Sequence, residues 1–364
     1  MKRLIAGTAA ALLGAVFFLP CHAMAISAER AIVMDASTGR VLYEKEADVP
    51  SLIASTTKIM TALIICEQCN VLDRMQIPKE AVNIEGSSMY LKEGEILTIQ
   101  DLLYGLMLHS GNDAAVALAI YCGGTVEGFV GLMNDKARNL GLKNTHFENP
   151  NGLDSPGHFS TARDLAVLTA YAMQNPIFAK TVSVKNISAG NRYLHNHNKL
   201  LWQVEGAEGV KTGFTKKAGR ILVSSTSRDG RRLIAVTIRD PNDWQDHKEL
   251  LEKGFSDFSH VPILEKGQVI GTVSVFGGTD NKVDLIAAED FSYALMRDEI
   301  PDVVLSGPGF TYAPVVENES AGYAYICLGD SPIGKIPVLY SETIEQQRVP
   351  ETSFWQRWFG DSKK

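Results

Sequence analysis

The sequence has little of what marks several common classes of protein. Its 364 residues include only five cysteines, and Cys66-x-x-Cys69 has no second pair, so buried apolar thiols are favoured over a redox or metal motif. A disulfide from Cys66 or Cys69 to Cys122 stays open. Lysine and arginine number 35 against 42 aspartates and glutamates, which argues against a nucleic-acid partner. No repeat or low-complexity stretch occurs, so a globular chain of about two domains is expected.

The N-terminus carries the one long apolar run. Two positive residues precede apolar residues 4–19, a run too short to span a bilayer comfortably, and residues 23–25 read Ala-Met-Ala. This pattern predicts a signal peptide over residues 1–25 and hence an exported protein. A lipid anchor on Cys21 is the alternative, disfavoured because proline precedes that cysteine. Cleavage leaves 33 basic and 42 acidic residues, a net charge of −9.

The stretch Ser55-Thr56-Thr57-Lys58 opens a segment, Ile59–Cys66, that is apolar on nearly every side. This composition predicts a buried helix with Ser55 at its start. Residues three apart share one helical face, so Ser55 and Lys58 would lie together as a hydroxyl beside an amine. The alternative is a helix-capping serine followed by a surface lysine.

A second candidate lies between two helical patterns. Residues 99–108 have apolar side chains at helical spacing, and residues 114–121 form an alanine-rich helix. Ser110 and Asn112 fall on the tight loop that joins them, where a hydroxyl and an amide can be held at fixed positions. The alternative is an ordinary helix–helix connection.

A third candidate, Lys211-Thr212-Gly213, comes before two predicted strands at 220–225 and 232–238. Asp229-Gly230 between those strands is a strong hairpin signal. A lysine and a threonine on a strand, followed by glycine, would let a substrate backbone approach closely.

Two other features of the chain are weaker. His195-x-His197 could place two imidazoles on one face of a strand, but no third ligand stands nearby, so no metal is expected. Arg220 and Arg239 flank the third candidate and could assist in binding a carboxylate, although surface positions are favoured.

The C-terminal part of the chain has a different sequence pattern from the part before it. Residues 259–345 read as short strands separated by turns, which predicts a separate all-β domain. The tail at 346–364 carries four aromatic residues that would share one side of a helix, with cations nearby. Such a helix suits a membrane surface, and docking on the β domain is the alternative. The four are Phe354, Trp355, Trp358 and Phe359.

Taken in order, Ser55-x-x-Lys58, Ser110-Gly111-Asn112 and Lys211-Thr212-Gly213 resemble the three motifs of the penicillin-binding proteins and serine β-lactamases. The residues around the three motifs are similar to those of the low-molecular-mass D-alanyl-D-alanine carboxypeptidases, and this similarity covers about residues 27–345. The stretches that carry this closer resemblance are 54–62, 108–114, 149–153, 158–165 and 209–215.

The resemblance implies an α+β fold. A β-lactamase/transpeptidase-like catalytic domain, an antiparallel sheet flanked by helices, would occupy residues 26–258. A small β-sandwich would follow at 259–345. The amphipathic segment 346–364 would hold the enzyme on the outer face of the bacterial cytoplasmic membrane.

The resemblance also implies the activity. The enzyme would be a serine-type D-Ala-D-Ala carboxypeptidase that removes the terminal D-alanine from peptidoglycan stem pentapeptides through an acyl-enzyme. β-Lactam antibiotics would be inhibitors, and no cofactor, metal or nucleic acid would take part.

Each motif residue takes a role from this resemblance. Ser55 would be the nucleophile, Lys58 its base, and Ser110 the proton relay to the departing D-alanine. Asn112 would bind the substrate amide, Lys211 and Thr212 its free carboxylate, Gly213 would admit its backbone, and the backbone N–H groups of Ser55 and Phe214 would bind the oxyanion.

Three alternatives remain. A β-lactamase is the nearest, but the class A element of a Glu followed by Leu-Asn is absent, and the β domain and the aromatic tail also argue against it. Phe214 stands where some relatives have histidine. A D,D-endopeptidase would share every motif. A non-catalytic wall-binding protein with a dead site is the third alternative, and the presence of all three motifs argues against it.

Overall fold

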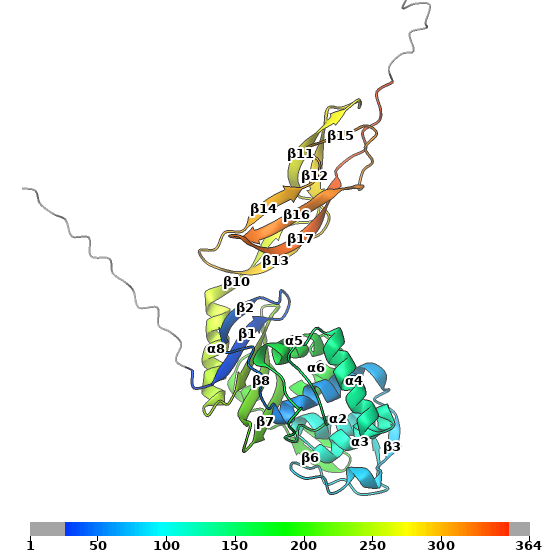
Figure 1. Ribbon diagram of the computed structural model, residues 1–364, viewed down its shortest axis with the longest axis vertical. Coiled ribbons are helices and arrows are strands. Elements are labelled where there is room, and N and C mark those ends of the chain that lie inside the picture. Colours follow the sequence, from blue (N-terminus) through cyan, green and yellow to red (C-terminus); the bar gives the residue numbers. More distant parts are fainter. Residues whose placement is uncertain (1–25, 349–364) are drawn as a thin grey trace, which may run out of the picture.

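The computed structural model describes residues 26–348 as two parts, a helix-rich unit up to Asp257 and a β unit from Phe258 onward (Figure 1). The predicted signal peptide and the aromatic residues of the tail lie outside the described residues. The α+β class with a β-rich C-terminal unit, predicted from the sequence, is confirmed.

The first unit is built on a five-stranded antiparallel sheet with the order β2-β1-β9-β8-β7. The predicted hairpin between β8 and β9 is present. Asp229 and Gly230 both have positive φ, 50° and 78°, which fits the two-residue turn that matches strand twist. The strands are β1 (Arg30–Asp35), β2 (Val41–Lys45), β7 (Ala207–Thr215), β8 (Gly219–Arg228) and β9 (Arg231–Ile238).

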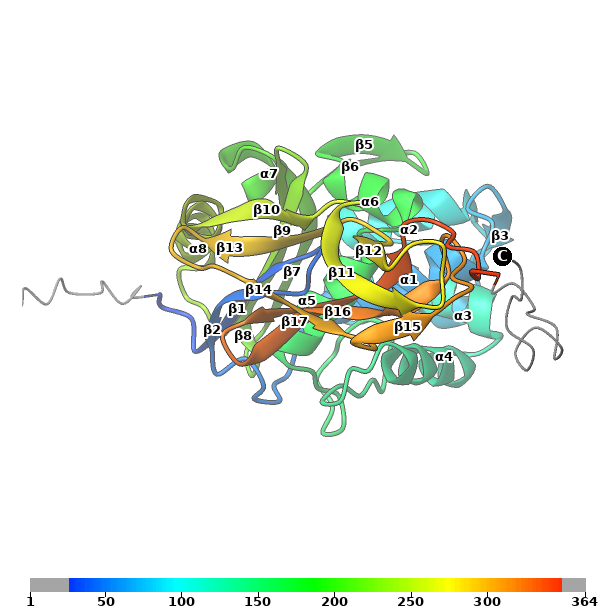
Figure 2. The same cartoon turned by 90° about the horizontal axis from the view of Figure 1, so that it is seen from above.

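Both faces of this sheet are covered. In β1, Ile32 packs into the larger helical core and its neighbour Val33 into a smaller core with Leu250 of helix α8 (Asp243–Asp257). Figure 2 shows α8 on one side of the sheet and α1, α2 and α3 on the other. The alternation of side chains along a strand thus feeds two cores.

The predicted buried helix is α1 (Lys58–Gln68), in which Lys58 through Cys66 are all buried. A 3₁₀ turn, Ala54–Thr57, precedes it, so Ser55 stands one turn before the α-helix rather than at its first residue. This 3₁₀ turn begins at Ala54, whose φ of 44° lies in the left-handed region.

The predicted pair of helices on either side of Ser110 is also present. Helix α2 (Ile99–Leu108) begins at a capping box between Thr98 and Asp101, and α3 spans Asn112–Gly123. Within residues 26–348 no single helix has the length and apolarity to cross a membrane. The bent pair of α3 and α4 (Val126–Asn139), with 84° between its members, meets the length and composition criteria.

Several helices were not predicted. Helix α8 is rich in charged residues. Leu250 and Leu251 are its large buried apolar side chains, too few to give a helical pattern in the sequence. Two others are short, α6 (Pro176–Ser183) and α7 (Leu200–Gln203). The remaining elements of this unit are α5 (Ala162–Ala172), η2 (Lys79–Ala81), β3 (Arg74–Gln76), β4 (Ile96–Thr98), β5 (Asn186–Ala189) and β6 (Arg192–His195).

The second unit is a six-stranded sheet with the order β14-β16-β17-β12-β11-β15, beside a two-stranded pair, β10-β13. Alternate residues of β11 and β12 meet in a compact apolar core. The strands are β10 (Phe258–Leu264), β11 (Val269–Phe276), β12 (Lys282–Ala287), β13 (Phe291–Met296), β14 (Asp302–Ser306), β15 (Phe310–Tyr312), β16 (Ser320–Leu328) and β17 (Ser331–Tyr340).

The two units join without a linker, because α8 ends at Asp257 and β10 begins at Phe258. Arg40, in the turn before β2, crosses the junction. Its guanidinium binds the Glu299 carboxylate at 2.6 and 2.7 Å, donates to the Ala294 carbonyl, and lies 5.0 Å from the centre of the Phe258 ring.

A buried ion pair at the end of β1 generates a stability prediction. The fully buried carboxylate of Asp35 accepts from Arg231 Nε at 3.0 Å and from Ser37 and Thr38. Burial acts to raise the pKa of Asp35, but these hydrogen bonds outweigh it and hold that pKa below its ordinary value. The pair therefore stabilises the fold at neutral pH, and this contribution is lost as the pH falls through the lowered pKa.

We expect Asp35→Asn to lower the free energy of unfolding at neutral pH by about 3 kcal/mol, because it leaves the buried Arg231 guanidinium without its counter-charge. Urea denaturation measures the change. The matched control is Asp280→Asn in an exposed turn, which should alter the free energy by less than about 0.5 kcal/mol. Equal stability of the two variants would contradict the assignment.

Candidate active site

Ser55 and Lys58 come together as the sequence predicts. The distance from Lys58 Nζ to Ser55 Oγ is 3.1 Å. The Lys58 side chain is fully buried, whereas Ser55 is half-buried and faces a pocket. The surface-lysine alternative is therefore wrong.

Two carbonyl oxygens complete the surroundings of the Lys58 amine. Lys58 Nζ donates to Asn112 Oδ1 at 2.7 Å and to the main-chain oxygen of Asn151 at 2.5 Å. Asn151 was not predicted as a site residue. Its only signal was the turn-forming stretch 149–153, since a main-chain oxygen leaves no mark in the residue type.

The electrostatics of the pocket rest on two buried lysines. Burial lowers the pKa of Lys58 well below its ordinary value, the positive charge of Lys211 lowers it further, and Asp113 opposes both. Lys211 is itself buried, its amine donates to the Thr212 carbonyl at 2.9 Å, and burial lowers its pKa to about 7. Burial and the charge of Lys211 thus both favour the uncharged form of the Lys58 amine.

Ser110 lies on the loop between α2 and α3 in the left-handed region, with φ at 61°, and lines the same pocket as Ser55. Asn112 is the first residue of α3, and its carboxamide has two protein contacts. Its Oδ1 accepts from Lys58, and its Nδ2 donates to the Glu85 carbonyl at 2.6 Å. One N–H of this amide is left over for a substrate.

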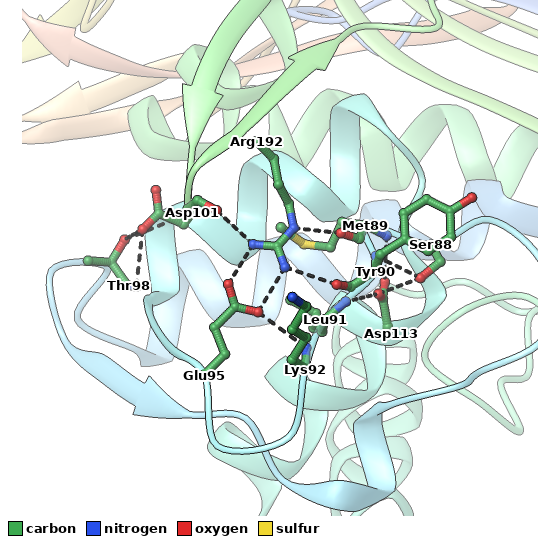
Figure 3. Close-up of polar contacts among 11 residues, drawn as sticks. Ser88, Met89, Tyr90, Leu91, Lys92, Glu95, Thr98, Asp101, Asp113 and Arg192 are labelled. Atoms are coloured by element: carbon green, nitrogen blue, oxygen red, sulfur yellow. Dashed lines mark hydrogen bonds and ion pairs between the residues drawn. The ribbon is translucent and has the colours of Figure 1, made fainter.

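The segment Glu85–Lys92 forms one wall of the site and is held from both sides. The Asp113 carboxylate accepts from the backbone N–H groups of Met89 and Leu91, both at 3.0 Å. On its other side, Arg192 donates to the Met89 carbonyl and binds the Glu95 carboxylate with two contacts, as Figure 3 shows. This wall in turn fixes Asn112.

The third motif lies on β7, at the edge of the sheet. Gly213 sits against the 3₁₀ turn, because a Cβ there would come within 3.2 Å of the Ile53 carbonyl and 3.3 Å of Thr56. The glycine thus lets β7 approach the turn that carries Ser55, a reason not foreseen from the sequence. Phe214 is 65% exposed and lines the pocket together with Thr212.

One pocket of about 380 Å³ joins the three motifs. Its lining also includes Lys199, the Arg220–Asp243 ion pair and Trp244. Its lining consists of Ser55, Ser87, Ser110, His197, Lys199, Thr212, Gly213, Phe214, Arg220, Ile221, Asp243 and Trp244.

The two arginines suggested for carboxylate binding differ in position. Arg220 lines the pocket, but its guanidinium already binds Asp243 through three contacts of 2.8 to 3.1 Å. Arg239 is exposed, donates to the Lys217 carbonyl, and does not line the pocket.

His158 is a buried residue that the sequence did not single out. Its Nδ1 accepts from the Glu148 backbone at 3.0 Å, so the neutral ring donates from Nε2 to Thr57 Oγ1 at 2.7 Å. Burial lowers the pKa of His158 to about 4. A neutral imidazole therefore holds Thr57, which lies between Ser55 and Lys58, through one hydrogen bond.

The two histidines of the weaker candidate differ in position. The His195 ring stacks on Trp202, with centroids 4.8 Å apart, whereas His197 lines the pocket and packs against His109. The four cysteines of the described chain are free thiols, and those of Cys69 and Cys122, one of the two suggested pairs, lie within hydrogen-bond distance of each other. Burial raises the pKa of the Cys66 thiol to about 12, as expected of a core cysteine.

Comparison with known families agrees with the geometry of both units. A sequence model described as D-alanyl-D-alanine carboxypeptidase matches residues 19–242, and one described as penicillin-binding protein 5, C-terminal domain, matches residues 258–346. D-alanyl-D-alanine carboxypeptidase DacF of Bacillus subtilis is 30% identical over 357 residues, which cover 94% of this chain and 91% of the relative. DacC of Escherichia coli is 33% identical over 345 residues, covering 89% and 86%.

Solved structures are similar over both units. Penicillin-binding protein 5 from Haemophilus influenzae matches with a TM-score of 0.77 and 29% identity, over 88% of this chain and 98% of the other. Penicillin-binding protein 6B from Escherichia coli matches with a TM-score of 0.71 and 30% identity, over 86% and 96%.

The two buried lysines generate a titration prediction. We expect Lys58 to titrate well below the ordinary lysine pKa of about 10.4. In Lys211→Met the pKa of Lys58 should rise, because a neighbouring positive charge that disfavours protonation is removed. The measurement is the ¹³Cε chemical shift of lysine against pH. Lys282→Met, at an exposed site in the β unit, is the control that should leave Lys58 unchanged. A Lys58 with an ordinary pKa would contradict the prediction.

Proposed function

The chain belongs to the D-alanyl-D-alanine carboxypeptidase family, and from this premise we propose which residues carry its acyl transfer and where it works. The protein is a serine-type D-Ala-D-Ala carboxypeptidase. It removes the terminal D-alanine of peptidoglycan stem peptides through an acyl-enzyme and is acylated by penicillin.

The contacts of the Lys58 amine are the observation that supports the mechanism most. A neutral amine has two N–H groups and one lone pair. The oxygens of Asn112 and Asn151 can only accept, so they take the two N–H groups, and the lone pair faces the Ser55 hydroxyl. Lys58 is then the base that accepts the hydroxyl proton as Ser55 Oγ attacks the carbonyl between the two terminal D-alanines.

The attack places negative charge on the substrate carbonyl oxygen. The backbone N–H groups of Ser55 and Phe214 are the proposed donors to it. The close packing of β7 on the 3₁₀ turn at Gly213 supports this pairing, because it brings the two backbone segments together. The carbon–nitrogen bond then breaks, and the proton held by Lys58 reaches the departing amine of D-alanine through Ser110.

The leaving D-alanine carries a free carboxylate, which Lys211 and Thr212 would bind. An anion beside Lys211 raises its pKa again and so favours its charged form. Lys199, which lines the same pocket, adds to the positive potential, whereas Asp243 balances the charge of Arg220. Water then attacks the Ser55 ester, which releases the shortened peptide and restores the serine hydroxyl.

We expect Ser55→Ala to lower D-alanine release from a D-Ala-D-Ala peptide by about 10³-fold or more, because no acyl-enzyme can form. Labelling by a fluorescent penicillin, followed on a denaturing gel, should disappear. Ser256→Ala, at an exposed position of α8, is the matched control and should keep both. Labelling that survives in Ser55→Ala would show that another residue is the nucleophile.

The site of action is also part of this proposal. The signal-peptide pattern over residues 1–25 supports export, and the aromatic face of the tail supports attachment to the outer face of the cytoplasmic membrane. The substrate, cell-wall peptide, lies on that side.

We expect the processed chain to begin at Ile26 on N-terminal sequencing and to sediment with membranes after cell fractionation. Trp355→Ser with Trp358→Ser should move most of the protein to the soluble exported fraction, because the apolar face of the tail is lost. Gln356→Ser, off that face, is the control and should not. A processed chain that stays with membranes in the tryptophan variant would place the attachment elsewhere.

A further inference from the structure

Three aromatic side chains gather at one end of the β unit and are open to solvent. Phe276, Phe310 and Tyr312 are 53%, 48% and 68% exposed. Their ring centroids lie 5.5 to 6.0 Å apart, so each ring touches the other two. We call these three residues the aromatic tip. They are unusual on a folded surface, where large apolar side chains seldom cluster without a partner.

The exposure follows from the strands. Val273 and Val275 of β11 point into the core of the unit, so Phe276 points outward. Phe276 is paired with Tyr312 of β15, and Phe310 shares the outward face two residues earlier. β15 is the edge strand of its sheet, and the described residues 26–348 place no further strand beside it.

The chain leaves the β unit beside the aromatic tip. The backbone N–H of Gln347 donates to the Gly277 carbonyl at 2.8 Å, directly after Phe276, and Gln346 bridges to Gly278. The sequence that follows contains the aromatic face of residues 354–359. β11 and β15 lie at the end of the molecule that is far from the helical unit (Figure 1). The tip and the start of the tail thus occupy one end of the protein, opposite the active-site unit.

We infer that the aromatic tip is a second membrane contact, whose rings enter the interfacial layer of the lipid bilayer beside the C-terminal tail. This inference rests on the proposed attachment of the tail. Aromatic rings favour the boundary between headgroups and acyl chains, where a Tyr hydroxyl can remain hydrated. A single weak anchor gives marginal, reversible binding, and two together give stable attachment.

The shape of the tip favours lipid over a sugar ligand. The rings of Phe276 and Phe310 meet at 86°, and those of Phe310 and Tyr312 at 89°. They form a knob rather than the flat platform on which a sugar ring would stack.

The charges around the tip are mixed. The adjoining turn and chain exit hold Asp280, Glu345 and Arg348. The contact is therefore apolar and should need neither anionic lipid nor low salt.

The test is sedimentation of the full processed chain with vesicles made of equal parts of phosphatidylethanolamine and phosphatidylglycerol. We expect the triple variant Phe276→Ser, Phe310→Ser, Tyr312→Ser to bind about tenfold more weakly or worse, and the difference to persist at high salt. The control is Ile300→Ser, which removes an 81% exposed apolar side chain from a different loop of the same unit and should bind like the parent. Release of D-alanine from a soluble peptide, unchanged in both variants, shows that folding and catalysis are intact.

Each other outcome overturns the inference. Equal vesicle binding of the triple variant and the parent would show that the tip does not meet lipid. Vesicle binding that is unchanged while binding to isolated peptidoglycan is lost would assign the tip to wall glycan. A parent chain that binds no vesicles would refute both the tip contact and the tail anchor, whereas the activity measured on soluble peptide tests the catalytic proposal separately.

Discussion

A lysine amine enclosed by two carbonyl oxygens and one hydroxyl is the constraint on which the rest of this structure depends. Placing an ammonium there would cost several kcal/mol, since the side chain is fully buried and its contacts among the described residues are neutral oxygens. In the mechanism we propose, the amine stays neutral, which avoids that cost and leaves it able to act as a base. Its reactivity then follows from its burial.

Such a base works only if its neighbours cannot move. Lys58 begins a helix that is buried along most of its length, so its position is set by the core of the unit. Asn112 is held by the Glu85–Lys92 wall, which Asp113 and Arg192 hold from opposite sides. Each of these contacts joins a side chain to a backbone group of the wall, and none involves the Ser55 hydroxyl. The wall and the buried helix thus hold the Lys58 amine and its partner Asn112 in place.

The sequence predicted the parts of this arrangement that residue types encode. The order of the three motifs, the apolar helix after Ser55 and the Asp229-Gly230 turn each have a local physical signature, and the structure contains all three. What it could not predict depends on distant contacts or on the backbone. The Asn151 carbonyl could belong to any residue, and His158 acquires its role only where a distant loop folds onto Thr57. Helix α8 has too few apolar residues for its periodicity to stand out.

The direct passage from α8 into β10 has a consequence for which peptides the enzyme meets. Domains joined by a loose linker swing relative to each other, but here a helix runs into a strand, and Arg40 ties the units across the joint. If the proposed attachment holds the far end of the β unit at a membrane, the pocket would stand at a height set by the length of that unit. The enzyme would then reach only those stem peptides that lie at that height above the membrane.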